Sequence, residues 1–135
     1  MERLKSILLV DDDDTTNLVN SFFIRQLDST LKVHMVRNGR EAIEFLQSAS
    51  RKEDMPCLMM LDLNMSIMSG WEFLDVYSEK FYDQLKEDVV IVMLTGMDLD
   101  DNTMAMSHPS VVDMIQKPLS DIKFRALVTK HFFSD

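Results

Sequence analysis

Short apolar segments alternate with longer amphipathic segments along the chain. Each of the five apolar segments has the length of a β-strand, and they cover residues 7–10, 33–36, 57–61, 89–94 and 111–115. Segments that are apolar at consecutive positions are typical of parallel strands that are covered on both faces of a sheet. The pattern therefore predicts a parallel sheet whose connections run through the amphipathic segments.

Five amphipathic segments predict helices. The first carries hydrophobic residues at helical spacing, which should face the sheet: Leu18, Val19, Phe22, Phe23 and Leu27. Similar stripes lie within residues 42–49, 73–81 and 124–132, whereas residues 98–107 lack a clean stripe and precede a helix-stopping His-Pro pair. Repeated β-α alternation predicts a doubly wound α/β fold with a five-stranded parallel sheet and five helices.

Three of the predicted helices also carry capping signals at their starts. Asn38 and Ser69 are each followed three positions later by a glutamate, which is the spacing of a capping box. Either Asp13 or Asp14 is expected to cap the first helix.

Composition and charge exclude several classes of function. The 135 residues fit a single domain and carry 23 acidic against 14 basic residues, a net charge of -9, whereas a nucleic-acid-binding domain needs a basic patch. Cys57 is the only cysteine, which excludes an internal disulfide and a cysteine-based zinc site. No segment approaches the roughly 20 apolar residues of a membrane span, and the N-terminus lacks a signal-peptide core. We therefore expect a cytoplasmic protein.

Polar residues stand where the predicted strands end. Asp11 and Asp12 follow the first strand, Asp62 ends the third, Thr95 follows the fourth and Lys117 the fifth. In a doubly wound sheet the site lies outside the carboxyl ends of the strands, so these groups should meet.

The grouped carboxylates need a positive partner. Two unit charges about 4 Å apart repel by roughly 1 kcal/mol in water and roughly 4 kcal/mol at an effective dielectric near 20. Mg²⁺ relieves such repulsion because it prefers oxygen ligands and often keeps phosphoryl oxygens in its shell. A carboxylate, a metal ion, a lysine and a hydroxyl are the groups that phosphoryl transfer to an aspartate requires.

Four segments resemble the response-regulator receiver domain of bacterial two-component signalling. They are Ile7-Leu8-Leu9-Val10-Asp11-Asp12-Asp13, Leu61-Asp62-Leu63-Asn64-Met65, Val92-Met93-Leu94-Thr95-Gly96 and Gln116-Lys117-Pro118-Leu119. Their order and their positions at strand ends match that family over the whole chain. The resemblance implies a flavodoxin-like receiver fold over residues 1–135, with no attached output domain.

The resemblance also implies roles for individual residues. Asp62 is expected to accept a phosphoryl group from a sensor histidine kinase, a phosphotransfer protein or a small phosphodonor. Asp12 would bind Mg²⁺ directly, Asp11 would bind it partly through water, and Asp62 and the main-chain carbonyl of Asn64 would complete the metal shell. Thr95 would then bond the phosphoryl group.

The family also assigns roles around the fifth strand. Lys117 would pair with the phosphoryl group, and the Lys117–Pro118 bond is expected to be cis. The switch aromatic of the family falls on Met114, so a rotating ring is replaced by a flexible thioether. A downstream protein would bind the face formed by the helix at 98–107, the strand at 111–115 and the last helix.

Two alternatives remain. Asp11 followed by Asp13 and Thr15 also fits the Asp-x-Asp-x-Thr motif of haloacid-dehalogenase-like phosphatases, with Asp11 as the nucleophile, although that reading leaves the segment around Asp62 unexplained. The other is a degenerate receiver that takes no phosphate and acts as a binding module.

Overall fold

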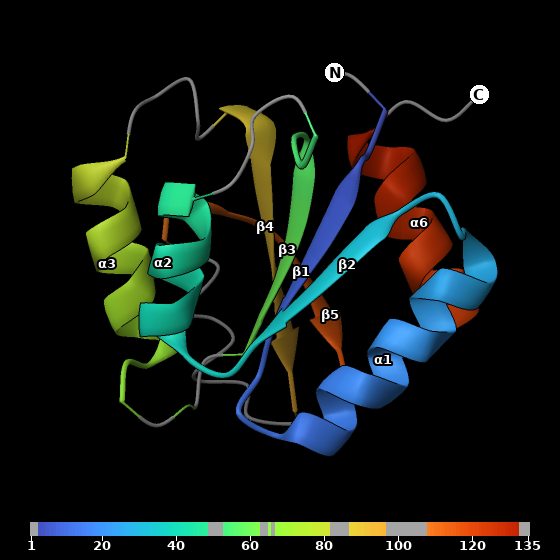
Figure 1. The fold of residues 1–135 in the computed structure, drawn as a ribbon, viewed down its shortest axis with the longest axis horizontal. Coiled ribbons are helices and arrows are strands. Elements are labelled where there is room, and N and C mark those ends of the chain that lie inside the picture. The colour runs from blue at the N-terminus through green and yellow to red at the C-terminus, as the bar shows by residue number, and fades with distance from the viewer. Residues whose placement is uncertain are drawn as a thin grey trace.

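The computed structural model describes residues 3–48, 53–62, 65, 67–81, 87–96 and 108–132. Within these ranges strands and helices alternate along the first four strands (Figure 1). The elements are β1 (Ser6–Val10), α1 (Asp14–Leu27), β2 (Lys32–Val36), α2 (Gly39–Ser48), β3 (Cys57–Asp62), α3 (Gly70–Lys80), β4 (Val89–Thr95), β5 (Val111–Gln116) and α6 (Asp121–His131). The predicted helix at 98–107 lies outside the described residues.

All five strands are parallel, in the order β2-β1-β3-β4-β5. Helices α1 and α6 cover one face of the sheet, and α2 and α3 cover the other (Figure 1). The predicted α/β fold with a five-stranded parallel sheet is therefore confirmed, and the observed strands differ from the predicted ones by at most one residue at an end.

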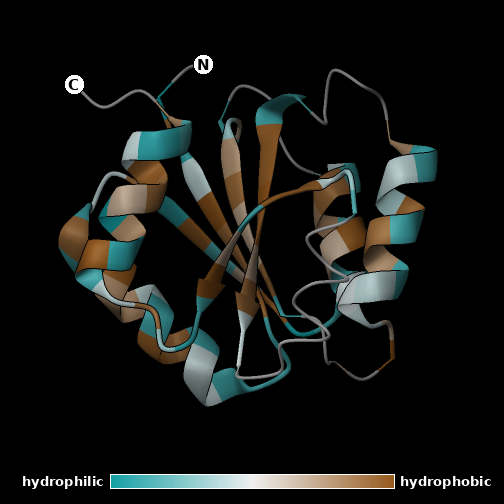
Figure 2. Ribbon diagram, turned by 180° about the vertical axis from the view of Figure 1, so that it is seen from behind, coloured by the Kyte–Doolittle hydropathy of each residue, from teal (hydrophilic) through white to brown (hydrophobic). Residues whose placement is uncertain are grey.

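The hydrophobic core has two layers, one on each face of the sheet. Along β1, Leu8 and Val10 belong to the layer under α2 and α3, whereas Ile7 and Leu9 belong to the layer under α1 and α6. Figure 2 shows the hydrophobic strands enclosed between these helices. The central strands β1, β3 and β4 are buried almost throughout, as predicted.

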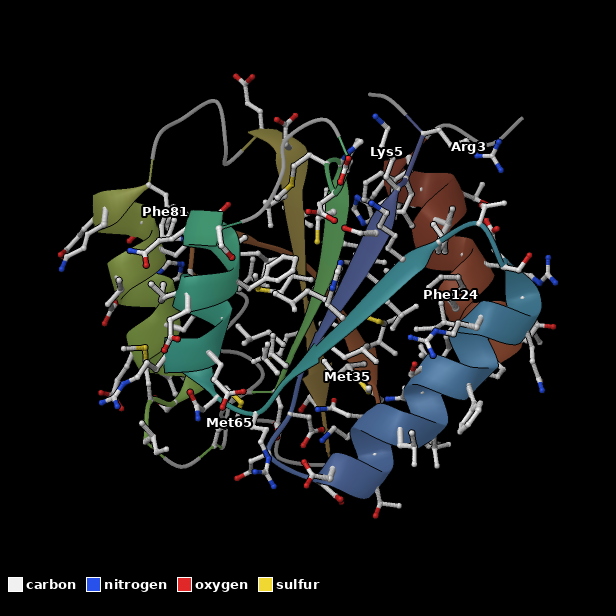
Figure 3. The ribbon with its side chains drawn as sticks, in the orientation of Figure 1. Arg3, Lys5, Met35, Met65, Phe81 and Phe124 are labelled. Atoms are coloured by element: carbon white, nitrogen blue, oxygen red, sulfur yellow. The ribbon has the colours of Figure 1, made fainter. Side chains whose placement is uncertain are left out.

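The edge strands depart from the prediction of complete coverage. Met35 on β2 and Val112 and Met114 on β5 are exposed, and Figure 3 shows Met35 on the strand at the outer edge of the sheet. An edge strand has a neighbour on one side only, so its outer positions lack the cover that central strands receive. The apolar run alone does not distinguish an edge strand from a central one.

Helix α1 presents a different face to the sheet than its sequence predicts. The residues it buries are Asn17, Ser21 and Ile24. Three of the hydrophobic residues predicted to face the sheet are exposed instead, by 51% for Leu18, 59% for Val19 and 60% for Phe22. The prediction is wrong for these three residues, although Phe23 and Leu27 do pack against the core.

A polar contact sets this rotation of α1. The Asn17 side-chain amide donates hydrogen bonds to the main-chain oxygens of Asp11, at 2.9 Å, and Val36, at 3.1 Å. These oxygens lie just beyond β1 and at the end of β2. A buried hydrogen bond contributes about 0.5–1.5 kcal/mol, so the two bonds favour the rotation that turns Asn17 inward and Leu18, Val19 and Phe22 outward.

The capping predictions are largely confirmed. Asp13 is the N-cap of α1, and Ser69 forms a reciprocal capping box with Glu72 at the start of α3. At α2, Asn38 accepts the N–H of Glu41, but the Glu41 carboxylate bonds the N–H of the residue before Asn38. Each cap fixes the start of a helix near the carboxyl edge of the sheet.

Candidate functional site

The parallel register brings the predicted site residues to one edge of the sheet. In the adjacent strands, Val10 pairs with Leu61, Asp62 with Leu94, and Thr95 with Gln116. Asp62 and Thr95 end β3 and β4, and Asp11 and Lys117 directly follow β1 and β5, so all four lie at the carboxyl ends of neighbouring strands. These strand ends form the lower edge of the sheet in Figure 1. In Figure 3, Met65, just after β3, lies at this edge, and Arg3 and Lys5 lie at the opposite one.

Three carboxylates meet at this edge. Asp11, Asp12 and Asp62 each offer an oxygen, and these oxygens lie within 4.8 Å of one another. Asp11 is buried, Asp62 is half-buried and Asp12 is exposed, so the cluster opens to solvent on one side. Several oxygen donors that concentrate negative charge suit a hard divalent cation, and these residues can hold a metal ion. Asn64, the fourth predicted ligand, lies outside the described residues.

Lys117 lies between two of the carboxylates. Its Nζ is 3.2 Å from Asp11 Oδ2 and 3.8 Å from Asp62 Oδ1. The Asp11 side chain is 6% exposed and the Asp62 side chain 14%, and such shielding strengthens the attraction relative to water. One ammonium against three carboxylates still leaves an excess of negative charge, which a bound cation can balance.

The main chain around Asp11 is held in place by α1. The Asp13 N–H donates to Asp11 Oδ1 at 3.0 Å, and the Asn17 amide bonds the Asp11 carbonyl oxygen. The sequence prediction did not identify Asn17 as a supporting residue. The available signal was a polar residue within the apolar stripe of the helix that follows the acidic run.

Asp13 caps α1 and does not belong to the cluster of Asp11, Asp12 and Asp62. Its carboxylate accepts the Thr16 hydroxyl at 3.0 Å and the N–H groups of Thr15 and Thr16. The hydroxyl bond from Thr16 is the largest of the effects that hold the pKa of Asp13 below its ordinary value. This placement agrees with the predicted capping role and separates Asp13 from Asp11 and Asp12.

The hydroxyl and the lysine are joined through their main chains. Thr95 is 7% exposed, and its Oγ1 donates to the Gly96 carbonyl at 3.4 Å. The Lys117 N–H donates to the Thr95 carbonyl at 2.7 Å. The predicted cis bond between Lys117 and Pro118 is confirmed, and a second cis bond joins Met55 to Pro56 at the start of β3.

A comparison with known families agrees with this geometry. The response regulator receiver domain family matches residues 7–129 of the chain. The chain belongs to this family. A receiver domain is a signalling domain of two-component systems rather than a classical enzyme.

Solved receiver structures resemble the protein over nearly its whole length. A two-component response regulator from Cytophaga hutchinsonii is 28% identical, covers 96% of this chain and 98% of its own, and has a TM-score of 0.79. A response regulator receiver protein from Dyadobacter fermentans shares the fold with a TM-score of 0.84 at 22% identity, over 96% of this chain and 99% of its own. The chemotaxis response regulator CheY4 of Vibrio cholerae has a TM-score of 0.73 at 20% identity, over 96% and 99%. No curated protein sequence matches the chain significantly.

Two remaining predictions concern the surface of this receiver domain. Met114, which the sequence predicts at the switch position, is 39% exposed on β5. Pro118 lines a groove of about 270 Å³ that Val19 of α1 and Leu94 of β4 also line. Among the described residues, no helix has the length and hydropathy needed to cross a membrane.

Proposed function

We propose that this receiver domain accepts a phosphoryl group on Asp62 in a Mg²⁺-dependent reaction. The donor is the phosphohistidine of a sensor kinase or of a phosphotransfer protein, or a small phosphodonor. The observation that carries the proposal is the position of the Lys117 ammonium, 3.2 Å from Asp11 and 3.8 Å from Asp62. That arrangement supplies a nucleophilic carboxylate, acidic metal ligands and a cation in one place.

Each residue of the site has a separate role in the transfer of the phosphoryl group. A carboxylate oxygen of Asp62 forms a new bond to phosphorus while the bond to the donor breaks, and the leaving group departs with the electron pair. Asp11 and Asp12 would hold Mg²⁺, which would neutralise charge on the phosphoryl oxygens. Lys117 pairs with one phosphoryl oxygen, and the Thr95 hydroxyl donates a hydrogen bond to another, so charge that builds during transfer meets preplaced donors.

The receiver domain would transmit its signal by contact with another protein in the cytoplasm. The face around β5 and the start of α6 supports this part of the proposal because it exposes apolar side chains, by 47% at Val112, 39% at Met114 and 82% at Ile122. Exposed apolar side chains on one part of a surface favour protein contacts.

Phosphorylation with acetyl phosphate and Mg²⁺ tests the proposal. We expect intact-mass spectrometry to detect one phosphoryl adduct that is stable to acid and removed by hydroxylamine, as an acyl phosphate is. The adduct should disappear in Asp62→Asn, which removes the nucleophile. It should persist in Asp13→Asn, a matched control in which the altered carboxylate caps α1.

Other outcomes would support the alternatives. An adduct that is lost in Asp11→Asn but retained in Asp62→Asn, together with steady release of phosphate, would support a phosphatase with Asp11 as nucleophile. Complete absence of an adduct in the wild-type protein, with Mg²⁺ present, would support a degenerate receiver that acts as a binding module.

A further inference from the structure

Lys123 makes two hydrogen bonds to the main chain on either side of Lys117. Its Nζ donates to the carbonyl oxygen of Gln116 at 2.7 Å and to that of Pro118 at 3.0 Å. One ammonium group thus joins the last residue of β5 to the connection that leads into α6. Lys117, whose side chain enters the carboxylate cluster, is the residue between these two carbonyls.

The position of Lys123 is unfavourable for a cation on general grounds. It is the third residue of α6, in the first turn, and its own N–H is bonded by the capping residue Ser120. The N-terminus of a helix carries partial positive charge and favours anions, as Asp121 in the same turn illustrates. Fixing a long side chain also has an entropic cost. The two carbonyl bonds offset these costs, because charged donors make the stronger hydrogen bonds.

The main chain at Lys117 is held from two sides as a result. On the sheet side, the Lys117 N–H donates to the Thr95 carbonyl at 2.7 Å. On the helix side, Lys123 holds the carbonyls that precede and follow Lys117. Reactions that depend on placed groups are sensitive to small shifts, and a misplacement of about 1 Å can cost on the order of 100-fold in rate.

We infer that Lys123 is a positioning residue, which holds the Gln116–Pro118 segment so that the Lys117 ammonium stays between Asp11 and Asp62. The inference rests on the proposed role of Lys117 in phosphoryl transfer. Lys123 itself contacts main-chain carbonyls, so it acts through Lys117 and takes no direct part in the reaction.

The test compares Lys123→Met with Lys130→Met. Both changes remove one positive charge from α6, but Lys130 bonds Asp113 on β5, at 3.0 Å, instead of the Lys117 segment. At saturating acetyl phosphate and Mg²⁺, we expect Lys123→Met to slow phosphorylation about tenfold, since a fraction of an ångström of displacement is involved. The phosphorylation rate of Lys130→Met should equal that of the wild-type protein. Lys123→Arg, which keeps charged donors, should restore most of the rate.

A second measurement is independent of phosphorylation. Amide hydrogen exchange at Lys117, followed by NMR, should accelerate in Lys123→Met and stay at the wild-type rate in Lys130→Met. Only Lys123→Met removes the bonds to Gln116 and Pro118, which flank the residue whose N–H donates to the Thr95 carbonyl. Lys123→Gln, which removes the positive charge and is one atom shorter than lysine, repeats both comparisons with a polar side chain if Lys123→Met does not fold.

The two measurements separate this inference from the proposed function. Equal rates and equal Lys117 exchange in Lys123→Met and Lys130→Met would overturn it. So would a Lys123→Arg variant as slow as Lys123→Met, since charged donors would then be irrelevant. If the wild-type protein takes no phosphoryl group while Lys117 exchange still accelerates only in Lys123→Met, the proposed function fails and the positioning of the Lys117 segment stands.

Discussion

Gly39 illustrates how a single residue without a side chain allows two connections to meet. It is the first residue of α2, and its N–H donates to the Met68 carbonyl at 2.8 Å, in the connection that precedes α3. A Cβ atom at this position would lie 2.7 Å from Met68 Cγ and 2.9 Å from Phe73 Cβ. The capping signal at Asn38 predicted the helix start, but the need for glycine depends on a residue 29 positions away and is not visible locally.

We expect Gly39→Ala to lower the free energy of unfolding by about 1–3 kcal/mol, the usual cost of overpacking. Urea denaturation followed by circular dichroism measures the change. Gly96→Ala is the matched control, because no atom lies within 4 Å of a Cβ built there, and its effect should stay within about 0.5 kcal/mol. Equal unfolding midpoints for the two variants would contradict this account of Gly39.

At the scale of the element, α1 shows what a hydrophobic pattern can and cannot predict. The spacing of Leu18, Val19 and Phe22 correctly predicted a helix, but it assigned these residues to the wrong side. The rotation depends on Asn17, whose bonds reach the ends of β1 and β2. A local pattern counts apolar residues, and it gives no weight to a buried amide that bonds the carbonyls of Asp11 and Val36.

Two substitutions on α1 measure which face is buried. We expect Phe22→Ala to change the free energy of unfolding by less than about 0.5 kcal/mol, since the ring is 60% exposed. Ile24→Ala should cost about 2–5 kcal/mol, because Ile24 is fully buried against the sheet. Chemical denaturation of both variants is sufficient, and a larger loss in Phe22→Ala than in Ile24→Ala would show that α1 has the orientation the sequence pattern predicted.

At the scale of the whole molecule, the sheet order explains why the candidate site was predictable from separate segments. Asp62 and Thr95 each end an apolar run, and Lys117 directly follows β5. Parallel strands then bring these ends to one edge whatever the details of the helices. Contacts made across elements, such as those of Asn17 and Lys123, depend on helix rotation and loop path, so the same rules do not predict them.

The carboxylate cluster should also link metal binding to the stability of the whole fold. A ligand that binds only the folded state stabilises it, by about 2.7 kcal/mol at a concentration 100 times its dissociation constant. We therefore expect Mg²⁺ to raise the thermal midpoint, measured by calorimetry against an EDTA control at equal ionic strength. Asp12→Asn should reduce this gain, because it removes one of the three carboxylates. An equal rise of the thermal midpoint in the wild type and in Asp12→Asn would show that Mg²⁺ binds outside this carboxylate cluster.

The pairing of Lys117 with Asp11 joins residues that lie 106 positions apart in the chain. During synthesis the acidic residues emerge first, and their internal cation emerges only with the end of β5. A nascent or truncated chain that stops before that strand holds the three carboxylates without the lysine that lies among them. The charge balance of the pocket is thus a property of the completed sheet, because the ion pair between Lys117 and Asp11 requires the end of β5.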